Sequence, residues 1–245
     1  MKTLLTILAI SLFASSALAA GRVIPYVVGS EQFEGYYVSP AAAAPLVLLV
    51  HDWDGLTDYE VKRAEMLAKM GYAVFAVDLF GKGIRPAAIE ERQKVTGALY
   101  GDRTRMRTLL QGGLAAAKSA GGNVKNAVAM GYCFGGAAIL ELARSGAELK
   151  GFVAFHGGLE TPAGQDYRQT KGTVLILHGT ADSSVTMEHF ADLAVELETA
   201  GISHEIITYS GAPHAFTVFG SDRYRQDADE KSWKRFGDFL HETLR

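Results

Sequence analysis

The sequence predicts an α/β fold, in which a mostly parallel central sheet is covered by helices on both faces. From residue 22 onward, short apolar runs of strand length alternate with stretches of helical periodicity. Several of these runs are continuously apolar, which indicates strands that are buried on both faces. Glycines follow several helical stretches, where they end one helix before the next strand. Strands that are connected through helices run parallel in one sheet.

The first expected element is a β-hairpin. Two β-rich runs, Val23–Val28 and Gln32–Val38, flank the turn-forming pair Gly29-Ser30. An alanine- and proline-rich connector, Pro40–Pro45, then leads to the continuous apolar run Leu46–Val50. We expect this run to be the first strand of the buried parallel sheet.

The rest of the chain repeats the alternation of strand and helix. The further predicted strands are Ala73–Val77, Val124–Met130, Phe152–Phe155, Thr173–Leu177 and Ile202–Tyr209. The predicted helices are Thr57–Met70, Arg103–Ala120, Phe134–Ala143, Ser184–Ala200 and Asp227–Leu244. Between them, the polar segment 80–101 contains a short helical stretch near Ile89–Leu99, and we expect this segment to form a mobile flap over a pocket. No linker or repeat interrupts the pattern, so residues 20–245 are predicted to form one domain.

Residues 1–19 have the pattern of a secretory signal peptide. Lys2 precedes the short apolar run Leu4–Phe13, and the small residues of Ala17-Leu18-Ala19 form a cleavage site. We therefore expect a periplasmic or secreted protein without a stable membrane anchor after cleavage. The alternative is that the segment stays uncleaved and anchors the protein in a membrane.

Composition excludes several classes of protein. With 48% hydrophobic and 21% charged residues, the chain is neither disordered nor collagen-like. A net charge of -3 gives no electrostatic reason to bind nucleic acid. The single cysteine excludes an intramolecular disulfide and a cysteine-based zinc cluster.

That cysteine lies in a pattern typical of a nucleophile. The segment Gly131-Tyr132-Cys133-Phe134-Gly135 follows a predicted strand and precedes a predicted helix, as the nucleophile elbow of α/β-hydrolases does. The central residue of an elbow sits in a strained turn, so its neighbours two positions away must be nearly free of side chain. The backbone N–H of Phe134 would form half of an oxyanion hole. The alternative is that Cys133 is a buried structural cysteine.

An acid and a histidine follow two later strands. Asp182 follows Thr173–Leu177, and His214 follows Ile202–Tyr209. Cys133, Asp182 and His214 thus occur in the chain order of α/β-hydrolases, and the carboxyl ends of the parallel strands bring all three to one sheet edge. His214 would accept the thiol proton while Asp182 orients the imidazole. The alternatives are that Asp182 only caps a helix and that His214 is a solvated loop residue.

The first buried strand ends in His51-Asp52-Trp53-Asp54-Gly55. In this fold the second N–H of the oxyanion hole comes from this position, which makes Trp53 the expected donor. Asp52 is expected to face the thiol of the nucleophile and to control its ionisation. His51 and Asp54 could also form a metal pair, but no further ligands are apparent, so we expect no metal.

These residues carry a resemblance to the dienelactone hydrolase family of α/β-hydrolases, which covers essentially the whole chain after residue 33. The carrying motifs are His51-Asp52-Trp53-Asp54-Gly55, Gly71-Tyr72-Ala73, Val77-Asp78-Leu79-Phe80, Gly131-Tyr132-Cys133-Phe134-Gly135-Gly136 and Gly211-x-x-His214-x-Phe216. The resemblance implies hydrolysis of an enol-lactone through an acyl-thioester on the cysteine. It assigns the triad of the family to Cys133, His214 and Asp182.

Two departures from the family pattern concern the nucleophile and the binding of the substrate. Asp52 stands where the family has a glutamate that switches the cysteine between thiol and thiolate. Val218 stands where the family has one of two arginines that bind the substrate carboxylate. Arg85 and Arg92 are candidates for the other arginine. The remaining candidates for substrate binding are Tyr100 and Phe216.

The sequence therefore predicts a periplasmic or secreted hydrolase that cleaves a small ester or lactone with its cysteine. We expect no cofactor, no nucleic acid partner and a monomer. The alternatives are an acyltransferase or peptidase on the same fold, or a non-catalytic binding protein that retains the fold.

Overall fold

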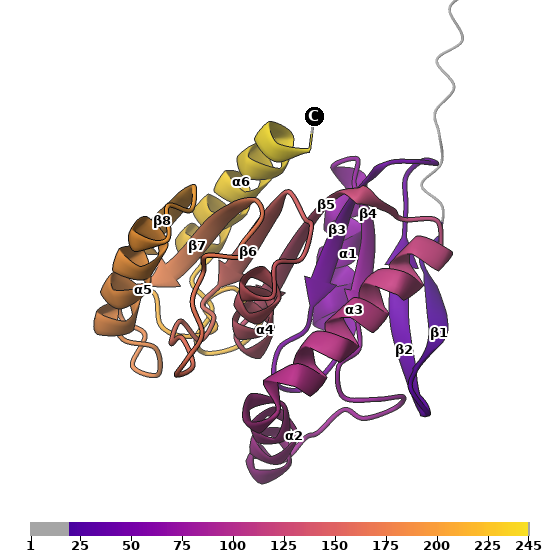
Figure 1. Ribbon diagram of the computed structural model, residues 1–245, viewed down its shortest axis with the longest axis horizontal. Coiled ribbons are helices and arrows are strands. Elements are labelled where there is room, and N and C mark those ends of the chain that lie inside the picture. Colours follow the sequence, from indigo (N-terminus) through magenta and orange to yellow (C-terminus); the bar gives the residue numbers. More distant parts are fainter. Residues whose placement is uncertain (1–19, 245) are drawn as a thin grey trace, which may run out of the picture.

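An eight-stranded sheet forms the centre of the structure, a computed structural model that describes residues 20–244 (Figure 1). The strands are β1 (Arg22–Val28), β2 (Glu31–Val38), β3 (Pro45–Val50), β4 (Ala73–Val77), β5 (Asn123–Tyr132), β6 (Gly151–Phe155), β7 (Thr173–Gly179) and β8 (His204–Tyr209). Their order in the sheet is β1-β2-β4-β3-β5-β6-β7-β8. The β1–β2 hairpin is antiparallel and β2 pairs antiparallel with β4, whereas β4, β3 and β5 to β8 are parallel. The predicted fold class is confirmed.

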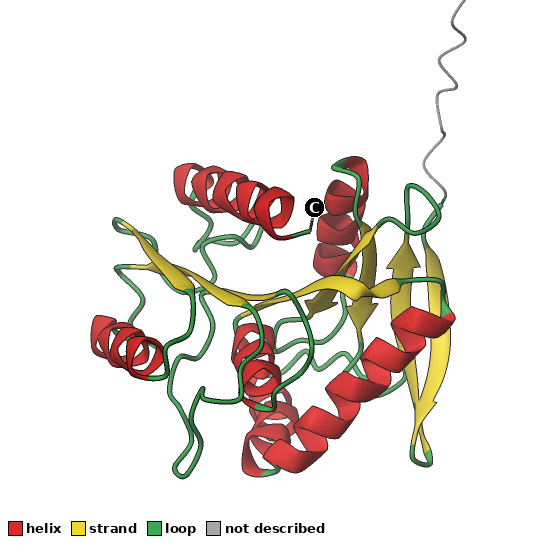
Figure 2. Cartoon of the chain, turned by 45° about the horizontal axis from the view of Figure 1, so that its top comes forward, coloured by secondary structure: helices red, strands yellow, loops and turns green. Residues whose placement is uncertain are grey.

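Helices cover both faces of this sheet (Figure 2). They are α1 (Asp58–Lys69), α2 (Ile89–Gly101), α3 (Arg103–Ser119), α4 (Phe134–Arg144), α5 (Met187–Thr199) and α6 (Gln226–Thr243). Leu67 of α1 and Phe236 of α6 belong to the core on one face. Met106 of α3, Ile139 of α4 and Leu193 of α5 belong to the core on the other face. Burial of these apolar side chains on both faces explains why the strands β3 to β7 are almost continuously hydrophobic.

Each predicted strand and helix is present; Ala73–Val77 has the predicted bounds, and the other elements are shifted at one or both ends. The helix predicted from Ser184 begins at Met187, because Thr186 is its N-cap and the preceding residues form a turn. The segment 80–101 carries a regular helix, α2, whose Thr96 and Leu99 are buried, so it is partly core rather than wholly a flap. Its mobility stays a prediction.

The carboxyl ends of the parallel strands all lie at one edge of the sheet, where α/β folds bind their ligands. The loops after β3, β5, β7 and β8 carry the residues predicted to be catalytic. Within residues 20–244, no helix combines the length and apolarity needed to cross a bilayer. The predicted signal peptide, residues 1–19, lies outside the described part of the chain.

Candidate active site

Cys133 occupies a strained turn between β5 and α4. Its φ of 49° and ψ of -113° are rare for a residue with a side chain. The turn brings Gly131 against the backbone of Gly135, and Gly135 against the carbonyl groups of Val50 and His51, so a Cβ at either glycine would overlap backbone atoms. These contacts are the physical reason for glycines on both sides of the cysteine.

The helix that follows directs its N-terminus at the sulfur. Cys133 is the N-cap residue of α4, and every residue of α4 is buried. The backbone N–H of Phe134 hydrogen-bonds the sulfur and lowers the pKa of the thiol. Burial and the nearby carboxylate of Asp52 act more strongly in the other direction, so the pKa of Cys133 lies well above its ordinary value. This shift favours the protonated thiol of Cys133.

The structure brings the three predicted catalytic side chains together. His214 Nε2 lies 3.0 Å from Cys133 Sγ, and His214 Nδ1 lies 2.7 Å from Asp182 Oδ2. The imidazole thus bridges the thiol and the carboxylate in the arrangement that nucleophile activation requires. His214 is not the solvated loop residue of the alternative prediction.

Asp182 uses its two oxygens for different purposes. Oδ1 accepts hydrogen bonds from the backbone N–H groups of Ser184 and Val185, each at 2.9 Å, while Oδ2 faces His214. Burial raises the pKa of the Asp182 carboxyl, but the hydrogen bonds outweigh burial and leave that pKa below its ordinary value. The capping role and the orienting role therefore coexist in one residue.

Thr217 anchors the loop that carries His214 to the rest of the protein. The Thr217 hydroxyl lies 2.8 Å from His156 Nε2, and the Thr217 carbonyl accepts a hydrogen bond from Arg63 Nη2 at 2.8 Å. Arg63 is fully buried and forms an ion pair with Asp229 of α6. The loop is thus tied to α1, to the end of β6 and to α6.

Asp52 points into the site beside the nucleophile, as predicted. It lines the same pocket as Cys133, and its carboxylate hydrogen-bonds the thiol. Burial raises the pKa of Asp52 to about 6. The backbone N–H of Trp53, the expected second donor of the oxyanion hole, donates to Asp52 Oδ1 at 2.5 Å. While Asp52 accepts this hydrogen bond, the Trp53 N–H is not free to donate to the oxyanion of a substrate.

The loop from Asp52 to Thr57 is held by a buried carboxylate that the sequence analysis did not single out. Glu60, at the third position of α1, accepts hydrogen bonds from the backbone N–H groups of Thr57 at 2.8 Å and Asp52 at 3.3 Å. It completes a capping box with Thr57. Burial raises the pKa of Glu60 to about 8. The pattern Thr-x-x-Glu in the sequence was the signal that could have revealed this role.

A pocket of about 320 Å³ opens above the triad. Besides Cys133, His214 and Asp52, its lining includes Trp53, Tyr100, Gly158, Ser184, Val185, Ala215 and Arg223. Tyr100, one of the candidates for substrate binding, therefore lines this pocket. Its ring packs edge-on against Phe134 at 5.5 Å.

Three other candidates do not line this pocket. Phe216 is fully buried and packs against His156 and Tyr209, so it is a core residue. Arg85 is turned away, because its guanidinium donates to the carbonyl groups of Leu56 and Ile84.

Arg92 likewise lies behind the pocket wall rather than in the pocket. Its Nε donates to the carbonyl of Pro86 at 3.0 Å, and its guanidinium lies 5.2 Å from the centre of the Trp53 ring. It also approaches the carboxylate of Asp54 to 3.7 Å. Arg92 therefore supports Trp53 instead of facing a substrate.

With this geometry established, comparison with known proteins decides the family. The sequence pattern of the dienelactone hydrolase family matches residues 33–244. The chain belongs to the dienelactone hydrolase family. It is a hydrolase of the kind that cleaves carboxylic esters, as the resemblance implied.

Individual relatives agree with membership of the dienelactone hydrolase family. A protein of Yersinia pestis named "Putative carboxymethylenebutenolidase" is 26% identical over 226 residues, which cover 88% of this chain and 82% of that protein. The crystal structure of the dienelactone hydrolase-like promiscuous phosphotriesterase P91, from metagenomic libraries, matches with a TM-score of 0.86 at 28% identity, covering 92% of this chain and 99% of that one. An acylaminoacyl peptidase of Pyrococcus horikoshii shares the fold alone, with a TM-score of 0.72 at 15% identity over 92% of this chain and 42% of its own.

Arg223 is a pocket residue of this dienelactone hydrolase family member that the sequence analysis missed. It is exposed and lies in the loop between His214 and α6. Val218, where the resemblance implied an arginine in the family, does not line the pocket, whereas Arg223 brings a guanidinium to its lining from further along the same loop. An arginine in an irregular loop carries no periodic signal, so only the folded loop shows where it lies.

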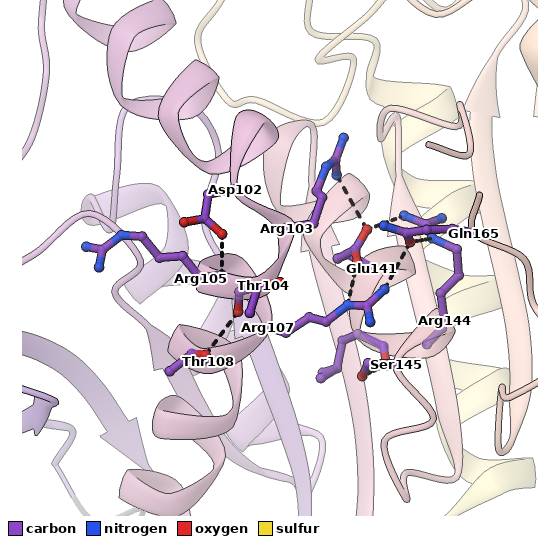
Figure 3. A network of polar contacts seen from close by, with 12 residues as sticks. Asp102, Arg103, Thr104, Arg105, Arg107, Thr108, Glu141, Arg144, Ser145 and Gln165 are labelled. Atoms are coloured by element: carbon purple, nitrogen blue, oxygen red, sulfur yellow. Dashed lines mark hydrogen bonds and ion pairs between the residues drawn. The ribbon is translucent and has the colours of Figure 1, made fainter. Parts of the chain in front are cut away.

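A cluster of ion pairs surrounds the buried carboxylate of Glu141 (Figure 3). Glu141 of α4 accepts from Arg107 Nε at 2.6 Å and from Arg144 Nη2 at 2.8 Å, and Arg103 Nη1 lies 3.7 Å away. Arg103 also lies over the Tyr100 ring and donates from Nε to the Tyr100 carbonyl at 3.0 Å. Although burial raises the pKa of Glu141, the arginines outweigh it and lower that pKa below its ordinary value. The helix of the nucleophile and the wall of the pocket are therefore linked through one carboxylate.

The residues of the site contain no preformed metal centre. Among residues 20–244, no group of three or more histidine, cysteine, aspartate or glutamate side chains is arranged to hold a metal ion. His51, the possible metal ligand after β3, instead accepts from the backbone N–H of Leu79 at 3.1 Å through Nε2. Burial lowers the pKa of His51 to about 4, in keeping with a neutral ring.

Proposed function

We propose that the protein hydrolyses a small carboxylic ester or lactone through a Cys133–His214–Asp182 triad and an acyl-thioester. The observation that carries the proposal is His214, whose two ring nitrogens lie 3.0 Å from Cys133 Sγ and 2.7 Å from Asp182 Oδ2. The pocket of about 320 Å³ above the sulfur suits a small substrate.

In the first half of the reaction, His214 Nε2 takes the thiol proton and Cys133 Sγ attacks the carbonyl carbon. The N–H of Phe134, and that of Trp53 once Asp52 releases it, stabilise the tetrahedral oxyanion. The C–O bond to the leaving group then breaks, and His214 returns the proton to the leaving oxygen. The acyl group remains on sulfur as a thioester.

In the second half, water replaces the leaving group. His214 removes a proton from the water as its oxygen attacks the thioester carbon, and the C–S bond breaks. The thiolate recovers the proton from His214, which restores the resting enzyme and releases a carboxylic acid. Asp182 stabilises the imidazolium in both halves.

Two experiments together test this proposal. A panel of p-nitrophenyl esters, lactones and phosphotriesters identifies the accepted class, and we expect turnover of small carboxylic substrates. Acid quenching during turnover, followed by mass spectrometry, should show the acyl mass on the peptide that contains Cys133. Turnover with no acyl adduct at any quench time would exclude the acyl-thioester, and absence of turnover of every ester and lactone in the panel would contradict the proposed substrate class.

Within this mechanism, Asp52 is proposed to keep the resting nucleophile protonated. Its carboxylate hydrogen-bonds the thiol and occupies the Trp53 N–H, so one side chain blocks both the sulfur and the oxyanion hole. A substrate whose carbonyl oxygen takes the Trp53 N–H displaces the carboxylate and frees the sulfur for His214. The thiol form resists oxidation better than the thiolate.

Asp52→Asn should therefore make Cys133 more reactive in the absence of substrate. Loss of the like charge lowers the pKa of the thiol, which raises the thiolate fraction at pH 7 roughly tenfold. The measurements are the rates of iodoacetamide labelling and peroxide inactivation as a function of pH, and the midpoint should move to lower pH. Asp58→Asn, which removes an exposed carboxylate of α1 that does not line the pocket, is the matched control. Equal labelling profiles for wild type and a folded Asp52→Asn variant would show that Asp52 does not control the thiol and acts only in the turn.

Arg223 gives the pocket a cation for substrates that carry a negative charge. We expect Arg223→Ala to raise KM about fivefold for an ester with a free carboxylate and to leave KM for a neutral ester unchanged, because only the charged substrate loses an attraction. Arg223→Lys keeps the charge and should restore most of the affinity. An equal rise in KM for both substrates would contradict a charge-specific role and indicate a loop defect.

We also propose that residues 1–19 direct the protein to the periplasm or out of the cell and are removed after Ala19. Support comes from Lys2, the apolar run Leu4–Phe13 and the small residues before the cleavage site. N-terminal sequencing of the protein from its own cell tests this proposal. A chain that still begins at Met1 would favour the uncleaved membrane anchor.

A further inference from the structure

The structure contains a groove of about 870 Å³ that is larger than the catalytic pocket and distant from it. It is bordered by the end of α3, the start of β5 and the segments that precede β6 and β7. These are the amino ends of the parallel strands, whereas Cys133 lies at the carboxyl end of β5. The groove is therefore at the edge of the sheet opposite to the chemistry and has no part in the proposed mechanism.

Four lysines surround this groove. Lys118, Lys125, Lys150 and Lys171 all line it, and all four are exposed. Within residues 20–244, none of them forms an ion pair with a carboxylate, and Glu148 is the one acidic residue in the lining. Because the whole chain has a net charge of -3, this edge is positive on a protein that is negative overall.

The helix dipole accounts for only one of these lysines. Lys118 is in the last turn of α3, where a positive charge interacts favourably with the helix dipole. Lys125 is in β5, and Lys150 and Lys171 are in loops, so the dipole does not explain them. The rest of the lining is mainly apolar, with Leu114, Val124 and Leu149 among its residues and Gln111 and Glu148 as its polar members. Cations around an apolar floor match a ligand that has anionic heads above hydrocarbon.

A further cation adjoins this edge. Arg22, near the beginning of the described chain, donates from Nη2 to the carbonyl of Ala120 at 3.2 Å. Ala120 lies in the turn between Lys118 of α3 and Val124 of β5. Figure 1 shows this end of α3 beside the β1–β2 hairpin. The positive region thus extends from the groove to the hairpin.

We propose that this edge docks on the surface of a bilayer that contains anionic phospholipid. The four lysines contact lipid phosphates, and the apolar floor rests against the glycerol and upper acyl region. Each lysine at such a surface strengthens partitioning about fivefold. Since the catalytic pocket is at the opposite edge, it would open away from the bilayer and toward dissolved substrate.

The test is flotation of residues 20–245, the part that contains every described helix and strand, with lipid vesicles at low and high salt. We expect binding to vesicles of phosphatidylcholine with one quarter phosphatidylglycerol, and little binding to phosphatidylcholine alone. The variant K118Q/K125Q/K150Q/K171Q should lose at least about 50-fold in partitioning. The control K62Q/K82Q/K94Q/K231Q removes the same charge outside the groove and should change partitioning by less than about threefold.

Three results would overturn the proposal. Equal binding to neutral and anionic vesicles would exclude recognition of anionic lipid. Equal losses of partitioning in the groove variant and in the control would show that binding depends on the total charge of the protein rather than on the groove. Displacement from vesicles by millimolar inorganic phosphate, but not by chloride of equal ionic strength, would make a soluble anion the ligand. Hydrolysis of a dissolved ester, which is expected to be unchanged in both variants, shows that they are folded.

Discussion

Replacing Cys133 by alanine is expected to lower kcat/KM for ester hydrolysis by about 10⁴-fold or more, because in the proposed mechanism the covalent intermediate forms on Cys133. The variant should remain folded, since alanine fills the same turn with a smaller side chain. Substrate binding depends on the pocket walls, so affinity for a product or inhibitor should change little.

The measurement is steady-state hydrolysis of the best substrate from the ester and lactone panel, with thermal unfolding as the test of folding. Iodoacetamide offers an independent route, because Cys133 is the only cysteine of the chain. Stoichiometric alkylation should abolish activity to the same degree. A folded Cys133→Ala protein, or a fully alkylated one, that kept more than about a tenth of the activity would exclude a cysteine nucleophile.

Asp182→Asn is expected to reduce kcat by about 10³- to 10⁴-fold with a small effect on KM. The asparagine carbonyl can still accept from the N–H groups of Ser184 and Val185, so the turn before α5 is preserved. Its amide nitrogen cannot accept a hydrogen bond from His214 Nδ1. The imidazole then no longer favours the tautomer with the proton on Nδ1, in which Nε2 is free to take the thiol proton. The substitution therefore separates the orienting role of Asp182 from its capping role.

Stability provides the second readout for Asp182. Its pKa is lower in the folded protein than its ordinary value, so the ionised carboxylate stabilises the fold at neutral pH. This contribution is present above about pH 4 and disappears as the pH falls through the folded pKa. The difference in unfolding free energy between wild type and Asp182→Asn should shrink accordingly in acid. Asp166→Asn, at an exposed carboxylate paired only with Arg168, is the control for kcat. A kcat within tenfold of wild type for Asp182→Asn would contradict the triad.

The positions of Cys133, Asp182 and His214 could be predicted because chain order and sheet geometry constrain them strongly. Parallel strands end at one edge, so residues directly after β5, β7 and β8 must approach one another. The glycines around Cys133 also indicated a turn in which backbone segments approach too closely for side chains, and few other structures require this. Asp52 could be placed for the same reason, since it follows β3, the neighbour of β5 in the sheet.

Substrate-binding residues could not be predicted with the same success. Arg85 and Arg92 lie in a segment whose path depends on tertiary contacts, and both guanidinium groups bond to backbone carbonyls instead of facing the pocket. Phe216 follows the catalytic histidine closely, but the positive φ of Ala215, 63°, precedes it, and the ring is buried in the core. Arg223 reaches the pocket through a loop without periodicity, for which the sequence offers no register.

The ion pairs around Glu141 could not be predicted from the sequence either. Arg103 and Arg107 are four residues apart on α3 and therefore share a face, but nothing in the sequence says that this face meets Glu141 of α4. Long-range pairing of buried charges follows from how helices pack on the sheet, which only the folded chain determines.

The loop that carries His214 follows β8, which is the last strand of the sheet and pairs only with β7. An edge strand has one hydrogen-bonded neighbour, so it opens at a lower free energy than the central strands do. Detachment of β8 with its loop would remove the base while the elbow of Cys133, in the middle of the sheet, stayed intact. Catalytic competence thus depends on an edge strand of the sheet, and heat or denaturant should extinguish activity before the central strands exchange their amide protons.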